Sequence, residues 1–407
     1  MTCCARELGS SEVIKKIINK IYWHEWAHPT LAYPWFLLQV LIVRRRYGHV
    51  LKRIQKRLSA GKRIRVLFHA EIPSKWKCQS IVDSMKKSTI FDPVVQVSEE
   101  GGKDSPQDVD IVFFQEPWDG KESVWKTSRS ALCCYMPYSI ETIAKAGRSE
   151  HFDYHHLANF HQLMFAQFQW CQAYADHSAA VMKPWERAGH MLGFGHSTLD
   201  VYTEVMGEDT HRQKGAVIFA PHFSFEYRGI TPISNVGTFQ WSGERVLEYA
   251  KSHPEMDWVF KPHPKLRDRL IEIGYWTQSQ VDAYYAEWSK VARCCYDGDY
   301  AKLFVDSRAM ITDCNSFLIE YMAVCHPLIR LIPEKCNVET CEQAKPLFDT
   351  FYTAHSQDEM LSWFEKVLER DEDPHRLARE TESRKLGIFG NHAGRRIVEW
   401  LEGVCRS

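Results

Sequence analysis

The chain repeats one pattern along most of its length: a short apolar segment of strand length, followed by a longer segment of helical character. The strand-length segments occupy residues 63–69, 108–114, 131–136, 179–182, 215–220, 257–261, 308–312 and 327–332, and helical segments at 77–87, 155–175, 243–253 and 313–322 lie between them. Strands that alternate with helices form parallel sheets of βαβ units. The sequence therefore predicts an α/β fold with two Rossmann-like parallel-sheet domains that face a cleft.

Two breaks in this pattern predict the boundaries. Residues 1–60 have helical character and end at Gly61, so we expect an N-terminal helical segment. The stretch 207–214 is polar and lacks apolar periodicity, which is typical of a linker. We therefore expect one Rossmann-like domain at 61–208 and a second at 209–407, closed by a C-terminal helix at 395–404. A chain of 407 residues is long enough for two or three domains of about 150 residues.

Composition excludes several classes of protein. Lys and Arg total 51 against 52 Asp and Glu, so we do not expect binding of nucleic acid through bulk positive charge, while a local basic patch stays open. No CxxC pair occurs among the 13 cysteines, and His155, His156 and His161 do not share one helical face, so we expect no metal and no other cofactor. Without a secretory signal, free thiols indicate a reducing cytoplasm.

One apolar run near the N-terminus bears on membrane contact. Residues 31–43 (LAYPWFLLQVLIV) make about 13 residues, whereas a spanning helix needs about 20. Basic residues follow directly, from Arg44 to Arg57. One interpretation is a core helix with a solvated basic continuation. The other is a helix lying in the interface of an anionic leaflet, which predicts peripheral attachment to the inner face of the cell membrane.

Polar clusters follow five of the expected strands, in both halves of the chain. They are Gln115-Glu116, Tyr138-Ser139, His222 to Arg228, Lys261 to Lys265, and Asp313 to Ser316. Ligands of doubly wound sheets bind beyond the carboxyl ends of the strands. These clusters therefore predict a site in the cleft between the two sheets.

The segment MITDCNSFLIEY, residues 310–321, passes from a buried strand through a polar turn into a helix. Unpaired N–H groups and the positive dipole end of a helix favour a phosphate there, and Asn315 and Ser316 add side-chain donors. Glu320 lies one turn further on the same face, where a carboxylate accepts hydrogen bonds from a ribose diol. In the alternative interpretation, Asp313 caps the helix and Glu320 is a surface acid.

Two histidine motifs follow neighbouring strands of the second half. In Lys261-Pro262-His263-Pro264 the flanking prolines restrict the backbone and thereby fix the imidazole, which predicts contact with an anion or acid–base chemistry. His222 and Ser224 follow an earlier strand, and Arg228 is a candidate phosphate ligand. The alternatives are a structural histidine in a rigid loop and a polar loop without a ligand.

The motifs IFAPHFS, WVFKPHP and SRAMITDCNSFLIEYM, in this order, resemble the CDP-glycerol glycerophosphotransferase family over residues 210–335. These enzymes polymerise wall teichoic acid and capsule and have GT-B architecture, with two Rossmann-like domains. The resemblance implies that residues 61–208 bind the acceptor and residues 209–407 the nucleotide donor. It implies that His263 and Ser316 contact the donor diphosphate and that Glu320 contacts the ribose or neighbouring donor hydroxyls.

The resemblance implies a transferase that moves a glycerophosphate, or a sugar or polyol phosphate, from a CDP-activated donor to a lipid-linked or polymer acceptor. The family's Trp-His-Gly segment, which carries the proposed base, is absent; Glu116 and His69 end expected strands and are the candidate bases. Whether a P–O or a C–O bond breaks stays open. So do a GT-B glycosyltransferase with another nucleotide sugar, a nucleotide-sugar 2-epimerase and a non-catalytic member that binds nucleotide or lipid.

Overall fold

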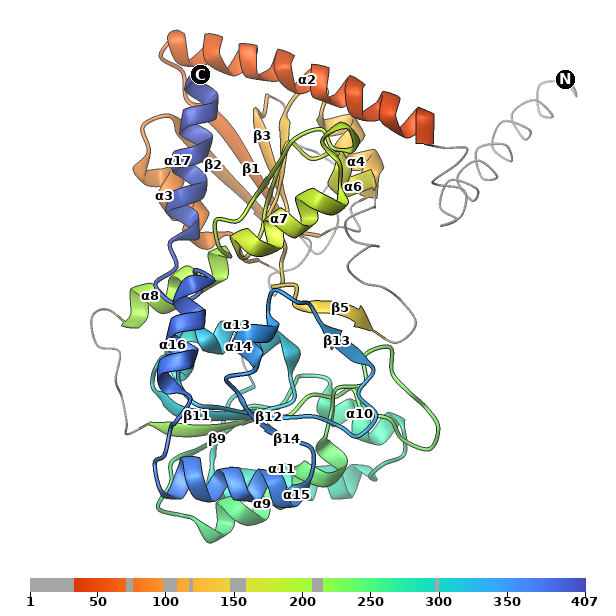
Figure 1. Ribbon diagram of the computed structural model, residues 1–407, viewed down its shortest axis with the longest axis vertical. Coiled ribbons are helices and arrows are strands. Elements are labelled where there is room, and N and C mark those ends of the chain that lie inside the picture. The colour runs from red at the N-terminus through yellow and green to blue at the C-terminus, as the bar shows by residue number, and fades with distance from the viewer. Residues whose placement is uncertain are drawn as a thin grey trace, which may run out of the picture.

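The computed structural model describes residues 33–70, 76–97, 108–116, 120–146, 159–206, 215–296 and 300–407. They form two six-stranded parallel sheets, stacked along the long axis of the molecule with helices on their faces (Figure 1). The predicted α/β fold with two parallel sheets and an N-terminal helix is confirmed. The expectations for residues 1–32 and for the linker at 207–214 lie outside the described residues.

The first sheet has the strand order β2-β1-β3-β4-β6-β7. Its strands are β1 (Ile64–Ala70), β2 (Phe91–Val97), β3 (Ile111–Phe114), β4 (Leu132–Tyr135), β6 (Ala166–Phe168) and β7 (His190–Leu192). The helices of this half are α2 (Tyr33–Ser59), α3 (Gln79–Lys87), α4 (Gly120–Thr127), α6 (Asn159–Gln162), α7 (Gln172–Val181) and α8 (Asp200–Met206).

Two expectations for this half were wrong, and one strand was not expected. Strand β2 was missed because Asp92 and Pro93 interrupt its apolar run; it lies at the sheet edge, where a strand tolerates a proline that has no N–H to donate. The expected helix at 155–175 contains β6, since a short apolar run has no period that separates a buried strand from a buried helix. The expected strand at 179–182 is instead the end of α7 and the residue after it.

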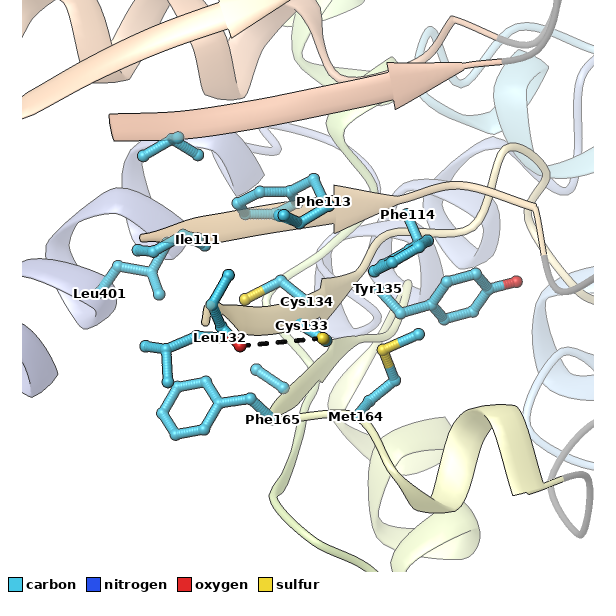
Figure 2. Close-up of a cluster of buried hydrophobic side chains, with 14 of the residues drawn as sticks. Ile111, Phe113, Phe114, Leu132, Cys133, Cys134, Tyr135, Met164, Phe165 and Leu401 are labelled. Carbon is cyan, nitrogen blue, oxygen red and sulfur yellow. Dashed lines mark hydrogen bonds between the residues drawn. The ribbon is translucent and has the colours of Figure 1, made fainter. Parts of the chain in front are cut away.

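The core of the first sheet includes the last helix of the chain, α17 (Ala393–Arg406). Figure 2 shows Leu401 of α17 beside Ile111 of β3, close to the buried side chains of β4. Ile397, Val398 and Cys405 of α17 are buried in the same cluster. The sequence placed this helix in the second half, but its apolar face packs on the first, because the chain crosses back before it ends.

Helix α2 is also part of this core. Its side chains Phe36, Val40, Val43, Tyr47, Val50 and Ile54 are buried, with the three- to four-residue spacing of one helical face. The core-helix interpretation therefore accounts for this face. Among the described residues, no helix combines the length and the apolar character needed to span a membrane.

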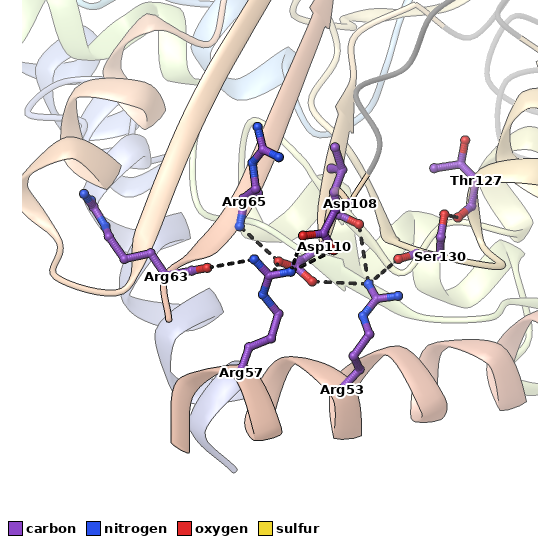
Figure 3. Close-up of polar contacts among 9 residues, drawn as sticks. Arg53, Arg57, Arg63, Arg65, Asp108, Asp110, Thr127 and Ser130 are labelled. Carbon is purple, nitrogen blue, oxygen red and sulfur yellow. Dashed lines mark hydrogen bonds and ion pairs between the residues drawn. The ribbon is translucent and has the colours of Figure 1, made fainter. Parts of the chain in front are cut away.

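The basic end of α2 is tied to the first sheet by ion pairs (Figure 3). The carboxylate of Asp110 is fully buried, accepts a hydrogen bond from the backbone N–H of Arg65 at 3.0 Å, and lies 3.2 Å from Arg53 Nη2 and 3.4 Å from Arg57 Nε. Arg57 also contacts the exposed Asp108 at 2.8 Å. These arginines anchor the helix to the start of β3.

The second sheet has the order β10-β9-β8-β11-β12-β14. Its strands are β8 (Ala216–Ala220), β9 (Trp258–Phe260), β10 (Arg293–Cys294), β11 (Ser307–Thr312), β12 (Leu328–Leu331) and β14 (Tyr352–Ala354). Its helices are α9 (Phe239–Ser252), α10 (Leu266–Glu272), α11 (Gln278–Val291), α12 (Ala301–Val305), α13 (Asn315–Met322), α14 (Lys345–Phe348), α15 (Gln357–Trp363) and α16 (Arg376–Lys385).

A two-stranded antiparallel ribbon links the two halves. Strand β5 (Ile143–Ala146) follows the first sheet's β4, and β13 (Val338–Thr340) follows the second sheet's β12; Val338 pairs with Ala146 (Figure 1). Together with α17, the ribbon connects the two halves at points far apart in the sequence.

Candidate functional site

The three motifs of the second half lie at the carboxyl ends of three adjacent strands. In the order β9-β8-β11, Lys261 and His263 follow β9, His222 follows β8, and Asp313 to Ser316 lead from β11 into α13. Helix α13 lies on the side of the second sheet that faces the first (Figure 1). The structure therefore brings these motifs together at the start of α13.

The two histidines are in contact and have defined tautomers. Their ring centroids are 4.8 Å apart. Nδ1 of His263 accepts the backbone N–H of Lys265 at 3.1 Å, and Nδ1 of His222 accepts the backbone N–H of Ser224 at 3.2 Å. A backbone N–H can only donate, so we assign the proton of each neutral ring to Nε2.

Both imidazoles are uncharged near neutral pH. Burial lowers the pKa of His222 to about 3, with a smaller contribution from His263. Burial, and then the charges of Lys265 and Lys261, lower the pKa of His263 to about 4. Each ring therefore offers an Nε2–H donor to an anion, and a bound anion would in turn favour the protonated form.

Lys261 provides a buried positive charge beside the histidines. Its ammonium lies 4.7 Å from the ring centroid of Tyr300 and 5.6 Å from that of Phe317, so it makes cation–π contacts with both. Lys261 is thereby held at the end of β9, close to the first turn of α13.

Asp313 anchors a loop instead of facing the cleft. Its buried carboxylate accepts the backbone N–H groups of His222 and Thr238, each at 2.6 Å, and the Thr238 hydroxyl at 2.8 Å. Burial raises its pKa to about 6. The N-cap residue of α13 is Cys314, while Asn315 is half-buried and Ser316 is exposed at the helix start. Asp313 therefore fixes His222, and Ser316 is the residue of this turn that is open to a ligand.

Glu320 lines a small cavity between the two halves of the molecule. It is only 8 % exposed, and its Oε2 accepts the hydroxyls of Tyr202 at 3.1 Å and Tyr300 at 2.9 Å. The cavity, of about 220 Å³, also touches Lys77 of the first half. Burial raises the pKa of Glu320, and the nearby Lys77 opposes this shift. Glu320 is thus not a surface acid, because its side chain is almost fully buried.

Sequence reasoning missed Lys77, Tyr202 and Tyr300. They lie in three separate segments of the chain, and none belongs to a recognisable motif. Only the folding of α8 and of the residues before α3 and α12 against α13 places them around Glu320.

The candidate bases of the first half lie at the ends of the paired strands β1 and β3. His69 is half-buried, and Glu116 is 0 % exposed. Between them, Gln115 donates to the backbone carbonyl of His69 at 3.2 Å and accepts the backbone N–H of Lys77 at 2.8 Å. His69 is therefore linked through Gln115 to the segment that lines the Glu320 cavity.

Ser224 contacts one of the two histidines, whereas Arg228 is exposed on a turn. The hydroxyl of Ser224 is 2.8 Å from His222 Nδ1, so Ser224 orients that ring. Arg228 is exposed on the turn closed by Tyr227 and Ile230, with a positive φ of 49°, and its guanidinium lies 5.1 Å from the Tyr227 ring centroid. In the described ranges, no group of three or more His, Cys, Asp or Glu side chains is arranged to hold a metal ion.

Comparison with known proteins shows the fold. No protein-family model and no curated protein matches the chain. The UDP-GlcNAc 2-epimerase of Neisseria meningitidis bound to UDP-GlcNAc aligns with a TM-score of 0.53 at 12 % identity, over 84 % of this chain and 100 % of that one. The S. aureus MnaA–UDP co-structure aligns with a TM-score of 0.53 at 12 % identity, over 83 % and 96 %.

The wall teichoic acid polymerase TagF aligns less well, with a TM-score of 0.49 at 9 % identity, over 84 % of this chain and 89 % of that chain. At these identities the first two matches establish that the chain has the GT-B fold and say nothing about its reaction. The TagF match adds nothing to this conclusion.

Proposed function

We propose that this protein is a transferase that binds a nucleotide-diphosphate donor between its two sheets and transfers the activated group to a hydroxyl acceptor. The observation that supports this most is the convergence of His222, His263 and Ser316 at the start of α13. Two Nε2–H donors, a hydroxyl and the N–H groups of a helix start together form an environment suited to a diphosphate. Lys261 adds the positive charge.

In the proposed reaction, the acceptor hydroxyl attacks the donor, and a base takes its proton. For glycerophosphate transfer the P–O bond between the two phosphates breaks and CMP leaves with the electron pair. For sugar transfer the anomeric C–O bond breaks and a nucleoside diphosphate leaves. In both cases negative charge grows on the leaving phosphate, where His263 and Lys261 stabilise it. His69 is the more accessible of the two candidate bases, since Glu116 is fully buried.

The donor class follows from the resemblance of the three motifs to CDP-glycerol glycerophosphotransferases. A second candidate function, a nucleotide-sugar 2-epimerase, is favoured by the fold match to the N. meningitidis enzyme, whose structure holds UDP-GlcNAc. An epimerase needs no acceptor, so product analysis separates the two functions.

A ligand screen tests the proposal. CDP-glycerol, CDP-ribitol, UDP-GlcNAc and CMP-linked sugars are compared by thermal shift, and the nucleotide that binds is then incubated with and without a polyol-phosphate acceptor. Release of CMP or a nucleoside diphosphate only with acceptor supports the transferase. An epimerised sugar without acceptor supports the second candidate, and no shift with any nucleotide contradicts both.

We expect Ser316→Ala to weaken binding of the identified nucleotide by about tenfold, the effect of one lost hydrogen bond to a charged group, without changing the melting temperature.

Glu320→Ala should weaken binding of the same nucleotide and also lower the melting temperature, because the hydroxyls of Tyr202 and Tyr300 lose their acceptor. Glu320→Gln retains an acceptor oxygen and is the matched control, which should melt close to wild type. Titration calorimetry measures binding; unchanged affinity in Ser316→Ala and Glu320→Ala would remove both residues from the donor site.

We also propose that the outer face of α2 attaches the protein to an anionic membrane surface, where a lipid-linked acceptor is found. Trp35, Leu38 and Leu41 are 53 %, 45 % and 57 % exposed. Exposed basic residues continue the same helical face, at positions 45, 52 and 56. Trp185 is exposed beside the start of the helix, where its indole N–H donates to the Tyr33 hydroxyl at 3.3 Å. An apolar patch followed by basic residues is typical of an interfacial helix.

We expect the protein to float with anionic vesicles at low salt, and less at high salt, because each basic side chain contributes about 1 kcal/mol at the surface and is screened over about 8 Å. Leu38→Ser with Leu41→Ser should reduce flotation without changing the melting temperature, since both side chains are exposed. The control is Leu377→Ser, an exposed leucine of the second half. No flotation with anionic or neutral vesicles at either salt concentration would leave α2 as a core helix alone.

A further inference from the structure

The largest cavity we describe lies apart from the candidate site. It has a volume of about 820 Å³ and lies at the carboxyl ends of β12 and β14, beside the β5–β13 ribbon. Both halves line it: His177 and Ala144 come from the first, and the remaining residues come from the second. None of its lining residues belongs to the His222–His263 cluster or to the cavity at Glu320.

Among the described residues, a half-buried arginine in this cavity has no anionic partner. Arg330 lies on β12 and is paired in register with Thr353 of β14, so both side chains point to the same face of the sheet. The Arg330 guanidinium lies 5.0 Å from the ring centroid of Phe348. Within the described residues it forms no hydrogen bond or ion pair, and burial lowers its pKa. A desolvated guanidinium without a counter-charge is costly, and a bound anion offsets that cost.

The rest of the cavity lining includes exposed carboxylates and threonine hydroxyls. Glu339, Glu342 and Asp349 are exposed and lie further out than Arg330, and Glu342 is paired with Lys345. The hydroxyls of Thr340 and Thr353 also line the cavity. Carboxylates and hydroxyls of this kind bind the hydroxyls of a polyol or sugar. The volume of the cavity exceeds what a phosphate ion alone needs.

We propose that this cavity binds a phosphorylated polyol, with the phosphate on Arg330 and the polyol hydroxyls on the outer carboxylates and threonines. The contact between Arg330 and phosphate is charge-assisted and suits the planar guanidinium. This binding goes beyond the proposed transferase function and does not depend on the donor. If the transferase proposal holds, the ligand is a phosphorylated polyol unit of the acceptor.

Titration calorimetry on the full chain with sn-glycerol 3-phosphate tests this inference, with inorganic phosphate and glycerol as comparison ligands. We expect saturable millimolar binding of glycerol 3-phosphate, weaker binding of phosphate and no binding of glycerol. Arg330→Met should reduce the affinity at least about tenfold. It should melt at or above the wild-type temperature, because the methionine keeps the contact with Phe348 and removes an uncompensated charge.

Two control variants make the test specific. Lys345→Met makes the same chemical change in the same cavity, at a lysine that is already paired with Glu342, and should retain the affinity. His263→Ala removes a donor of the candidate site and should also retain it. The inference is overturned if the wild type shows no saturable binding, if Arg330→Met binds as the wild type does, or if His263→Ala loses binding as well. A failure of nucleotide binding would contradict the transferase proposal alone.

Discussion

Replacement of His263 by alanine is expected to lower kcat by about 100-fold with the donor that the ligand screen identifies. The ring of His263 is fixed because its Nδ1 accepts the backbone N–H of Lys265. The backbone N–H of His263 donates to the Pro221 carbonyl at 2.9 Å, which fixes the main chain. In the proposed reaction, the ring therefore needs no reorganisation to donate its Nε2–H to the leaving phosphate. His222→Ala should have a smaller effect, because His222 is more deeply buried than His263 and its pKa is lowered further.

The variant His263→Gln separates two roles of this residue. Glutamine provides an N–H at a similar position and carries no titratable proton. If neutral His263 acts as a hydrogen-bond donor, His263→Gln should recover at least about tenfold of the lost rate. The wild-type pH profile of kcat/KM, which reports the free enzyme, should then show no step from His263 between pH 5 and 8, since its pKa is about 4. A wild-type step in this range that disappears in His263→Gln would show proton transfer instead. A near-native rate in His263→Ala would remove His263 from the reaction.

Replacement of Asp110 by asparagine is expected to lower the free energy of unfolding by about 3 kcal/mol, the effect of breaking a buried ion pair. The Asp110 carboxylate is fully buried between Arg53, Arg57 and the backbone N–H of Arg65. The variant leaves both guanidinium groups without their buried counter-charge. We place the effect at the lower end of the range for such pairs, because the side chain of Arg53 is 40 % exposed and regains water.

Asp108→Asn is the matched control for this measurement. Asp108 pairs with the same Arg57, but its side chain is 63 % exposed, so the loss should be much smaller than that of Asp110→Asn. Asparagine also tolerates the positive φ of 73° at this position. Urea unfolding monitored by tryptophan fluorescence and circular dichroism gives both values. Equal losses in the two variants would show that burial of Asp110 adds nothing to the anchoring of α2.

The sequence predicted correctly those strands whose apolar run and following polar turn are visible in a few neighbouring residues. The strands β8, β9 and β11 contain apolar runs that end in polar turns, so the sequence was sufficient to predict their positions and the location of His222, His263 and Ser316 after them. The sequence was misleading for β2 and β6. An edge strand with a proline and a three-residue strand within a longer apolar run have no distinct local signal.

The candidate site shows the same division. The sequence predicted Asp313 and Glu320 as candidate site residues, and the structure places them in the predicted turn and helix. It could not show that the Asp313 carboxylate accepts hydrogen bonds from the backbone N–H groups of His222 and Thr238. Nor could it show that Glu320 is buried and accepts hydrogen bonds from Tyr202 and Tyr300. Those partners come from segments far away in the chain, and their contacts do not depend on any local pattern.

The sequence by itself thus determined the two-sheet α/β class and the strand ends where polar side chains gather, because apolar runs and turn residues act over a few neighbouring positions. The tertiary structure decided which of these side chains are open to a ligand and that α17 belongs to the core of the first sheet. It also placed Arg330 half-buried in a cavity where no described residue provides a counter-charge. Burial and charge pairing are set by residues brought together over long sequence separations, and no window of the sequence contains them.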